Sequence, residues 1–241
     1  MDADLIATGH YARTRLKKDG KNELLKGLDE TKDQSYYLAL LNQETLKRTI
    51  FPLGESRKEE IIKVFQKEIG PEAKMIESQN LCFLSGHNYH DFLEKYAPES
   101  IQRGEIINTQ GQHLGFHEGL AFYTIGQRKG IKISAKDAYY IVRKSRQDNR
   151  IIVGFKEELG KDIFQIKDMH WISEIPQKGE KQYAVKIRYR ANPVLAKVKP
   201  SDDPTSFEIK LKRKLRDVTP GQYAVLYHRD AVVGAGEISY N

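Results

Sequence analysis

The chain has 241 residues, of which 39% are hydrophobic, and it carries a single cysteine. No apolar run approaches the roughly 20 residues that a membrane-spanning helix needs, and one cysteine excludes a disulfide within the chain. Met1 is followed by Asp2 rather than by a basic and apolar secretory signal, and one thiol suits a reducing compartment, so we expect a cytoplasmic protein with no membrane partner.

The charge balance is basic. Lys and Arg number 40 against 33 Asp and Glu, which gives a formal net charge of +7. Such a surface attracts phosphate backbones through long-range fields and counterion release. Charge alone leaves two interpretations open, a nucleic-acid-binding protein and a protein that is basic for other reasons.

The first predicted element is a short apolar strand from Leu5 that runs into a loop at Gly9 and His10. Strands that are apolar on both faces usually belong to parallel sheets covered by helices, and parallel neighbours need crossover connections. We therefore expect the chain to begin in the middle of an α/β domain. Ligands of such sheets bind beyond the carboxyl ends of the strands, so Gly9 and His10 either face a ligand or simply end the strand.

Two helices are predicted next. Asp33 is a good N-cap for a helix that continues to Leu41, and the polar run Lys32-Asp33-Gln34 projects from its start. From these residues alone, plain capping is the favoured role of that run. Ser56-Arg57-Lys58-Glu59 forms a capping box, and apolar residues at helical spacing then predict a helix that stops at Gly70.

The only thiol, Cys82, lies between Leu81 and Phe83 after a polar stretch. A free cysteine with apolar neighbours is most often an inert core residue. A reactive thiol would need a lowered pKa, and the sequence does not reveal which cation would lower it. The local sequence therefore favours a core residue.

The middle of the chain predicts a short helix from Tyr89 to Tyr96 and then extended structure. The expected strands, with a hairpin turn at Gln110-Gly111, are Gly104–Asn108, Gly115–Glu118, Tyr139–Val142 and Ile151–Gly154. Gly126 and Gly130 bracket the pair Arg128-Lys129. That loop either cradles a phosphate or is a surface turn.

The last third predicts a small antiparallel sandwich or barrel. Apolar residues from Tyr183 to Tyr189 alternate with polar ones, a period of two that continues in later strands. The outward faces are rich in Lys and Arg, and such a face is either solvated or turned toward RNA. Tyr189 between Arg188 and Arg190 favours RNA, because aromatic rings and guanidinium planes stack on bases.

Segments along the whole chain resemble, in order, the tRNA-specific 2-thiouridylase (tRNA-uridine 2-sulfurtransferase) family. They are Ala7–Ala12, Lys32–Tyr36, Phe51–Glu55, Ser78–Phe83, Tyr123–Gly130, Arg188–Arg190 and Thr219–Gln222. The resemblance implies an α/β plus β fold. Residues 1–85 would be the C-terminal remainder of a Rossmann-type, adenine-nucleotide α-hydrolase-like domain, residues 86–160 a small central tRNA-binding domain, and residues 161–241 an antiparallel β-barrel.

The resemblance also implies an activity. Enzymes of this family adenylate the C2 oxygen of the wobble uridine of tRNA with ATP, and a cysteine persulfide then delivers sulfur to C2. The sulfur comes from a cysteine desulfurase through relay proteins. By position in the motifs, Cys82 is similar to the persulfide cysteine and Gly9 to a glycine that contacts ATP. The positions that match tRNA contacts are His10, Lys32, Asp33, Gln34, Arg188, Tyr189 and Gln222. No metal and no DNA partner are expected.

The chain departs from the family pattern in several places. The ATP pyrophosphatase motif Ser-Gly-Gly-x-Asp-Ser does not occur in it, nor does the upstream cysteine that can form a disulfide with the persulfide cysteine. Glu77 replaces a usual Asp, and Lys132 and Ser134 interrupt a glycine-rich stretch. Most of the ATP site is therefore expected outside this chain. A catalytically inactive tRNA-binding fragment is the alternative hypothesis, and a barrel protein without a role in thiolation is a third.

Overall fold

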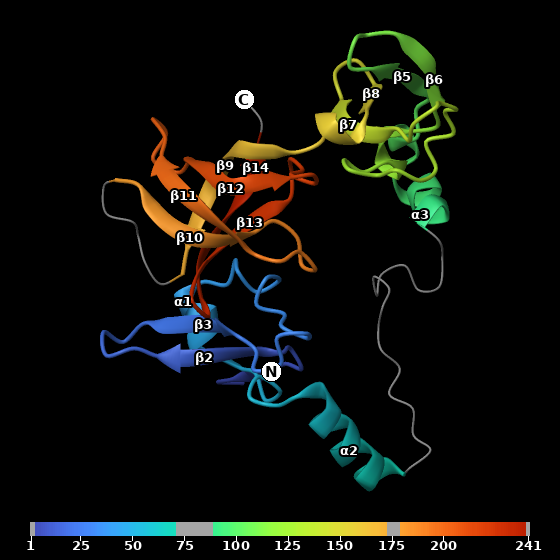
Figure 1. Ribbon diagram of the computed structural model, residues 1–241. Helices are drawn as coiled ribbons and strands as arrows, with labels where there is room; N and C mark the ends of the chain where they lie inside the picture. The colour runs from blue at the N-terminus through green and yellow to red at the C-terminus, as the bar shows by residue number, and fades with distance from the viewer. Residues whose placement is uncertain (1–2, 71–88, 173–178, 240–241) are drawn as a thin grey trace. The chain divides into compact units, whose positions relative to one another are not determined.

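The computed structural model describes residues 3–70, 89–172 and 179–239, which form two compact units (Figure 1). The first, here called the barrel unit, comprises Met1–Met75, Asp162–Arg213 and Thr219–Asn241. The second, the central unit, comprises Ile76–Lys161 and Lys214–Val218. In the described ranges, no helix is long and apolar enough to cross a membrane.

Six strands of the barrel unit close into an antiparallel ring in the order β13-β10-β11-β12-β9-β14, with β13 paired back to β14. Their bounds are β9 Lys161–Trp171, β10 Lys181–Lys186, β11 Val194–Pro200, β12 Phe207–Leu215, β13 Tyr223–His228 and β14 Ala231–Ser239. The period of two directs alternate side chains inward, as Tyr183 and Val185 of β10 show with 4% and 0% exposure. The predicted barrel is confirmed.

The N-terminal segment adds a hairpin to this sheet. Strands β2 (Ala12–Leu16) and β3 (Asn22–Lys26) pair with each other, and β3 pairs with β14. Two short strands form a separate parallel pair: β1 (Ile6–Ala7), which precedes the hairpin in the chain, and β4 (Thr49–Ile50), which follows it. Helix α1 (Gln43–Lys47) comes directly before β4. The predicted parallel strand is confirmed, but its expected burial is wrong. Ile6 is 55% exposed, because β1 and β4 form a sheet of only two strands in the described residues, which leaves this side chain open to solvent.

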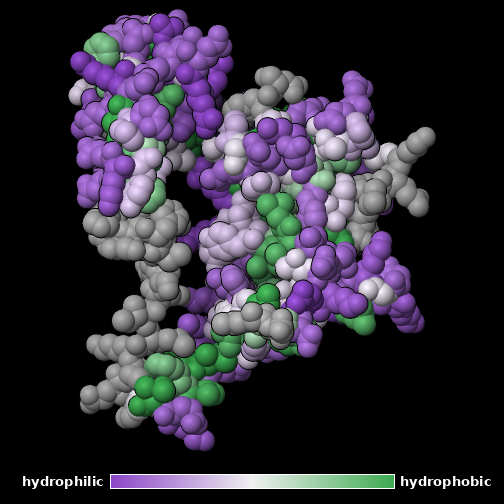
Figure 2. Space-filling model, turned by 180° about the vertical axis from the view of Figure 1, so that it is seen from behind, coloured by the Kyte–Doolittle hydropathy of each residue, from purple (hydrophilic) through white to green (hydrophobic). Residues whose placement is uncertain are grey.

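Of the two helices predicted in this segment, one is absent and one is present. Residues 35–40 form consecutive turns rather than a helix, with Tyr37 N donating to Gln34 O at 3.0 Å. Helix α2 (Lys58–Ile69) is confirmed, but its cap lies one residue later than predicted, because Arg57 N donates to Glu60 Oε2 at 3.1 Å. None of its residues is buried. Val64 and Ile69 are 58% and 68% exposed, and Figure 2 shows the hydrophobic surface on α2.

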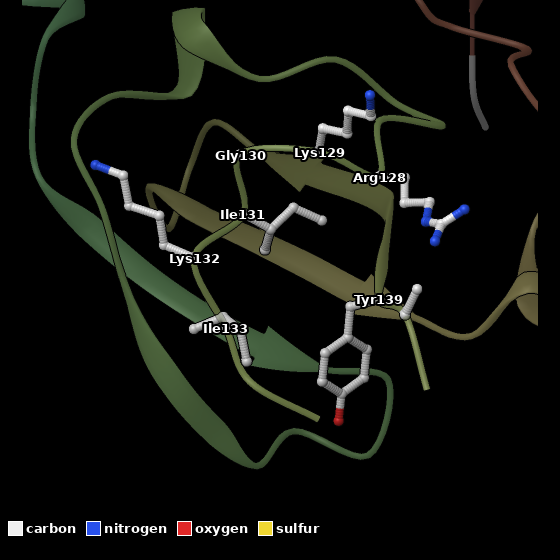
Figure 3. Close-up of a pocket in the computed structure, with 8 residues that line it drawn as sticks. Arg128, Lys129, Gly130, Ile131, Lys132, Ile133 and Tyr139 are labelled. Carbon is white, nitrogen blue, oxygen red and sulfur yellow. The ribbon is translucent and has the colours of Figure 1, made fainter. Parts of the chain in front are cut away.

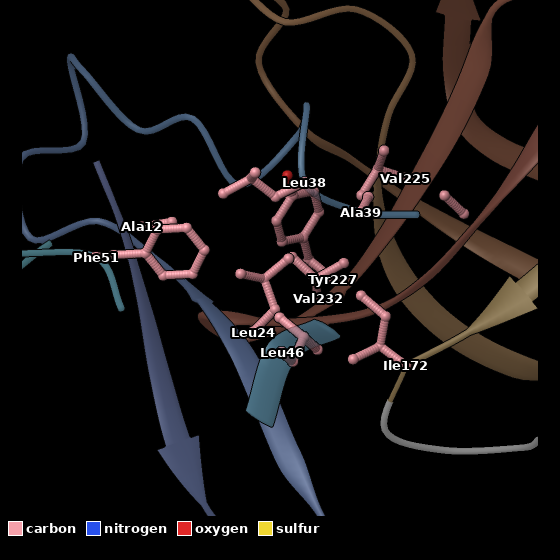
Figure 4. Close-up of a cluster of buried hydrophobic side chains, with 11 residues drawn as sticks. Ala12, Leu24, Leu38, Ala39, Leu46, Phe51, Ile172, Val225, Tyr227 and Val232 are labelled. Carbon is pink, nitrogen blue, oxygen red and sulfur yellow. The ribbon is translucent and has the colours of Figure 1, made fainter. Parts of the chain in front are cut away.

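One hydrophobic core joins the N-terminal segment to the barrel (Figure 4). Leu24, Leu38 and Phe51 from the N-terminal segment pack with Val225 and Tyr227 of β13. Tyr227 is fully buried, and its hydroxyl lies 3.2 Å from Ser35 Oγ. Burial of apolar surface stabilises a fold by about 25 cal/mol per Å², and this gain keeps the turns at residues 35–40 packed against the barrel.

The central unit is built on a four-stranded sheet in the order β6-β5-β8-β7. Its elements are α3 (Tyr89–Tyr96), β5 (Gly104–Asn108), β6 (His113–His117), β7 (Tyr140–Ser145) and β8 (Arg150–Gly154). Ile106, Ile141 and Ile151 are fully buried in its core. The predicted short helix, the hairpin and the two later strands are confirmed.

Candidate nucleic-acid interface

The predicted site residues of the barrel unit lie on segments that are distant in sequence and close in space. These segments are the loop after β1, residues 32–37 (the 32–37 loop), the turn at 188–191 and the turn at 219–222. Contacts described below link each segment to the next. Cys82 lies outside the described residues, and so does the whole motif Ser78–Phe83.

Asp33 holds the shape of the 32–37 loop. It is 5% exposed, and its Oδ1 accepts hydrogen bonds from Gly27 N at 3.2 Å and Ser35 N at 3.0 Å. Its Oδ2 accepts from Ser35 Oγ at 3.1 Å. The carboxylate therefore forms its hydrogen bonds within the protein, as in the capping role that the sequence favoured. The helix that Asp33 was expected to cap is replaced by turns.

Lys186, at the end of β10, connects the loop to the barrel. Its Nζ lies 3.9 Å from Asp33 Oδ2 and 5.6 Å from the ring centroid of Tyr189. Burial lowers the pKa of Lys186, and the Asp33 carboxylate acts in the opposite direction. Lys186 therefore places a half-buried cation between the predicted residues Asp33 and Tyr189.

Gln34 ties the 32–37 loop to the loop after β1. Tyr11 N donates to Gln34 Oε1 at 3.0 Å, and Gln34 N donates to Tyr11 O at 2.9 Å. The neighbouring His10 is fixed in turn, since its Nδ1 lies 2.9 Å from Thr8 Oγ1. Gly9 is exposed, and the nearest atom to an added Cβ would be Leu53 Cδ1 at 3.9 Å. The predicted positions Gly9, His10 and Gln34 are thus brought together.

Two tyrosines of the loop pack against the 188–191 turn. The Tyr37 ring lies 4.5 Å from that of Tyr189 at an interplanar angle of 30°, and Tyr36 meets Tyr37 edge-on. Tyr36 is anchored to the barrel, because its hydroxyl donates to Tyr223 O of β13 at 2.9 Å. Burial raises the pKa of Tyr36 to about 12, so this hydroxyl stays a hydrogen-bond donor at neutral pH.

The strand predicted to include Arg188 ends earlier. β10 stops at Lys186, and Ala191 N donates to Arg188 O at 3.1 Å, which closes a turn. Arg188 Nη2 donates to Thr219 Oγ1 at 3.0 Å, and Gln222 N donates to Thr219 O at 3.3 Å. Gln222 itself is exposed. The turn therefore connects Tyr189 to the third predicted segment.

Three residues that contribute to this surface were missed by the sequence reasoning: Tyr37, Lys186 and Tyr223. Tyr37 directly follows the matched motif, so an adjacent exposed aromatic residue was an available signal. Lys186 looked like one more outward lysine in an alternating strand, and its role depends on the long-range contact with Asp33.

The basic loop of the central unit has a different character. Arg128, Lys129 and Lys132 line a cavity of about 310 Å³ with Ile131 and Tyr139. Figure 3 shows the three cationic side chains pointing in different directions, so they do not converge on one point. Gly126 and Gly130 adopt φ values of 85° and 81°, and Gln127 Nε2 donates to Lys129 O at 2.8 Å, so the loop is a braced surface turn.

Potential metal ligands are sparse in the part of the chain that the structure describes. His90, Asp91 and Glu94 of α3 offer ligand atoms within 4.8 Å of one another, and all three residues are exposed. Exposed acidic groups cluster without an ion in many proteins. This group supports no metal centre, and the expectation that the chain binds no metal stays a prediction.

Three family models match the chain in succession. They are the tRNA methyl transferase HUP domain over residues 1–86, the tRNA methyl transferase PRC-barrel domain over residues 90–155 and the aminomethyltransferase beta-barrel domain over residues 161–238. A Rossmann-like domain, a PRC-barrel domain and a closed antiparallel barrel define a class of multidomain proteins with tRNA-modifying domains. This succession confirms the predicted α/β plus β fold class.

Curated relatives narrow the class. The tRNA-specific 2-thiouridylases MnmA of Thermosynechococcus vestitus and Natranaerobius thermophilus are 38% and 39% identical to this chain over 99% of it, and that of Desulforudis audaxviator is 38% identical over 98%. The chain belongs to the tRNA-specific 2-thiouridylase family, as the sequence motifs predicted. It spans 64%, 65% and 68% of the lengths of these three relatives.

Proposed function

We propose that this chain serves the 2-thiolation of tRNA, in which persulfide sulfur is transferred to C2 of an ATP-activated wobble uridine. The observation that carries the proposal is the convergence of the positions matched to the family's tRNA contacts. Segments around residues 10, 32–34, 188–189 and 222 are linked by direct contacts within the barrel unit. The names of the relatives and the matched domains support the same function.

The surface has the chemistry that RNA binding requires. Arg188 and Lys32 supply cations that can neutralise phosphates, and Tyr37 and Tyr189 supply aromatic faces. The anchored backbones of the loops hold these groups in place before RNA arrives, which lowers the entropy cost of binding. We propose tRNA as the partner, bound by the surface that segments of residues 1–85 and 161–241 form together, with the central domain of residues 86–160 as a further tRNA-binding region.

Cys82 is the proposed sulfur carrier, loaded by a cysteine desulfurase or a sulfur-relay protein of the cytoplasm. The terminal sulfur of a persulfide is a good nucleophile. Its attack forms the C2–S bond as the bond from C2 to the adenylated oxygen breaks and AMP leaves. The uridine is then joined to Cys82 through the S–S bond. A second thiol, which this chain with its single cysteine does not supply, would attack Cys82 Sγ, form a disulfide with it and release 2-thiouridine. The domain of residues 1–85 would present this cysteine to the uridine.

Gly9 is proposed to contact ATP, which supplies the adenylyl group when bound. Two observations fit this role. Gly9 follows β1 at its carboxyl end, where α/β sheets bind ligands, and Gly9 is exposed, with no atom closer than 3.9 Å to an added Cβ. A ligand could therefore approach the Gly9 backbone closely.

The decisive test is sulfur loading of Cys82 combined with tRNA binding. The chain is incubated with a cysteine desulfurase and cysteine, persulfide is trapped by alkylation, and the modified residue is located by mass spectrometry. We expect persulfide on Cys82, none in Cys82→Ser, and equal tRNA affinity of both proteins in a filter-binding assay. In cells that depend on this gene, Cys82→Ser should abolish 2-thiouridine.

A catalytically inactive tRNA-binding fragment is the alternative. It is favoured by the fact that the contacts that link the surface among the described residues, such as Tyr11 with Gln34 and Tyr37 with Tyr189, require no chemistry at Cys82. Under this alternative, tRNA binds and Cys82 takes up no sulfur. If the wild-type chain binds no tRNA, neither function holds.

A further inference from the structure

Tyr37 is an aromatic side chain with one face covered and the rest open. It is 60% exposed, although the Tyr189 ring lies 4.5 Å away at 30° and the Tyr36 ring lies 5.8 Å away at 80°. An isolated exposed aromatic residue needs no explanation, since much of any protein surface is apolar. Tyr37 differs because a second ring backs it, which is the arrangement of a stacking surface.

The support under Tyr37 is fixed. Tyr189 sits above the Lys186 ammonium at 5.6 Å, and Tyr36 is anchored through its hydroxyl to Tyr223 O at 2.9 Å. The backbone of the loop is held as well, since Tyr37 N donates to Gln34 O at 3.0 Å. A ring that is already ordered loses little conformational freedom when a second ring packs on it.

The surroundings of this ring pair are cationic. The Lys186 ammonium lies over the Tyr189 ring. The positive charges of Lys32 and Arg190 act on the Tyr189 hydroxyl. The buried carboxylate of Asp33 acts on this hydroxyl with the opposite sign. Arg188 acts on Tyr36 in the same way. An aromatic face framed by positive charge is complementary to a ligand that is planar and anionic, and RNA combines both properties.

We propose that Tyr37, backed by Tyr189, is a stacking platform for an unpaired nucleobase of the bound RNA. This inference rests on the proposed function and adds to it a residue that directly recognises the substrate. A paired base cannot use the platform, because its faces are covered by its neighbours in the helix. The platform would therefore favour a loop or a splayed-out nucleotide over a duplex, with little preference for base identity.

The test compares a hairpin RNA that carries 2-aminopurine in its loop with a blunt RNA duplex of equal length. The proteins are the wild-type chain, Tyr37→Ala, Tyr37→Phe and the control Leu40→Ala. Leu40 is 46% exposed in the same run of turns, so its truncation removes a similar apolar side chain without an aromatic face. Circular dichroism and thermal melting confirm that each variant is folded.

We expect Tyr37→Ala to weaken hairpin binding about 5- to 100-fold, as measured for the loss of one stacked base. The slope of log affinity against log salt should not change, because no charge is removed. Tyr37→Phe should bind within about two-fold of wild type and, like wild type, quench 2-aminopurine fluorescence, while Tyr37→Ala should not quench it. Duplex binding should be equal in all four proteins.

Three outcomes overturn the inference in distinguishable ways. If the wild-type chain binds the hairpin and Tyr37→Ala binds it equally well, the stacking platform is wrong and the proposed function stands. If the wild-type chain binds neither RNA, the proposed function fails and the platform fails with it. A loss in Tyr37→Ala that Leu40→Ala matches would also refute stacking, since it would reflect damage to the loop.

Discussion

At the scale of single residues, a matched motif does not mean that each side chain contacts the ligand. Asp33 and Gln34 use their side chains to hold the 32–37 loop, through Gly27 and Ser35 in one case and Tyr11 in the other. Arg188 is different, because its guanidinium bonds to Thr219 while the residue remains half-exposed. The motif therefore contains both residues that build the surface and residues that can face RNA.

Arg188 is the residue for which a phosphate contact can be tested by charge alone. Arg188→Ala should weaken tRNA binding and reduce the slope of log affinity against log salt by about 1, because one fewer counterion is released. Filter binding from 50 to 200 mM salt measures both quantities. Arg15→Ala is the matched control, since the Arg15 guanidinium already pairs with Glu23 Oε2 at 2.6 Å. An unchanged slope in Arg188→Ala would argue against a phosphate contact there.

At the scale of elements, close contacts between turns and strands decide which glycines are needed. Gly54 follows β4, and a Cβ added to it would lie 1.9 Å from Ala12 O of β2. Its own carbonyl accepts a hydrogen bond from Leu28 N at 2.9 Å, so the turn cannot move away freely. Gly9 is the opposite case, because a Cβ added to it would make only an ordinary van der Waals contact, with Leu53 Cδ1 at 3.9 Å.

Gly54→Ala should therefore destabilise the protein by about 1 to 3 kcal/mol, the usual cost of overpacking. Gly9→Ala should change stability by less than about 0.5 kcal/mol, as surface substitutions do. Urea unfolding of the two variants beside the wild type measures the difference. The Gly9→Ala variant also tests the proposed role of Gly9. If it is as stable as wild type but impaired in thiolation, the result supports a contact of Gly9 with ATP. Equal stability of Gly54→Ala and wild type would contradict the close contact.

The same scale explains which elements were predictable. Strand β10 has a regular period of two, and α3 ends at Tyr96, two residues before Pro98, so both follow from local sequence. Strand β9 was missed because Asp168 adopts φ 51° where the pairing with β14 shifts register, which interrupts the alternation. The 35–40 segment has helical spacing, but the contact of Ser35 with Tyr227 stabilises turns instead.

The site was predictable to a lesser extent than the fold. Motifs identified the segments, since each is a short run of neighbouring residues. They did not indicate that Lys186 would lie beside Asp33 or that Tyr36 would bond to the backbone at Tyr223, because these contacts join residues more than 150 positions apart. Such contacts follow from the closure of the barrel, which no local pattern contains.

At the scale of the whole molecule, we expect the stability of the central unit to depend on pH through one buried histidine. The central unit buries His117 completely, with Nε2 3.1 Å from Asn149 O and with no hydrogen-bond partner for Nδ1 among the described residues. Burial lowers the pKa of His117, and the Asn149 carbonyl only partly offsets this. A proton on Nδ1 would create a buried charge, so the folded unit favours the neutral ring.

The sign of the pH effect follows from linkage. Because the pKa of His117 is lower in the folded than in the unfolded state, the unfolded state binds more protons on acidification. The stabilisation is fully present above the ordinary histidine pKa of about 6.5 and is lost as the pH falls below it toward the folded value. Carboxylates titrate mostly below this window, so a comparison of pH 7.5 with pH 5.5 reports mainly on histidines, and a substitution of His117 is needed to separate it from the others.

Amide hydrogen exchange, corrected for the intrinsic rate at each pH, separates the units in one sample. We expect the protection of Ile141 and Ile151 in the central unit to fall between pH 7.5 and pH 5.5, and Val225 and Leu226 in the barrel unit serve as the internal reference. In His117→Gln the amide side chain can still donate toward Asn149 O but cannot titrate, so most of this pH dependence should disappear. If His117→Gln loses protection on acidification as wild type does, another group in the central unit is responsible and the assignment to His117 is wrong.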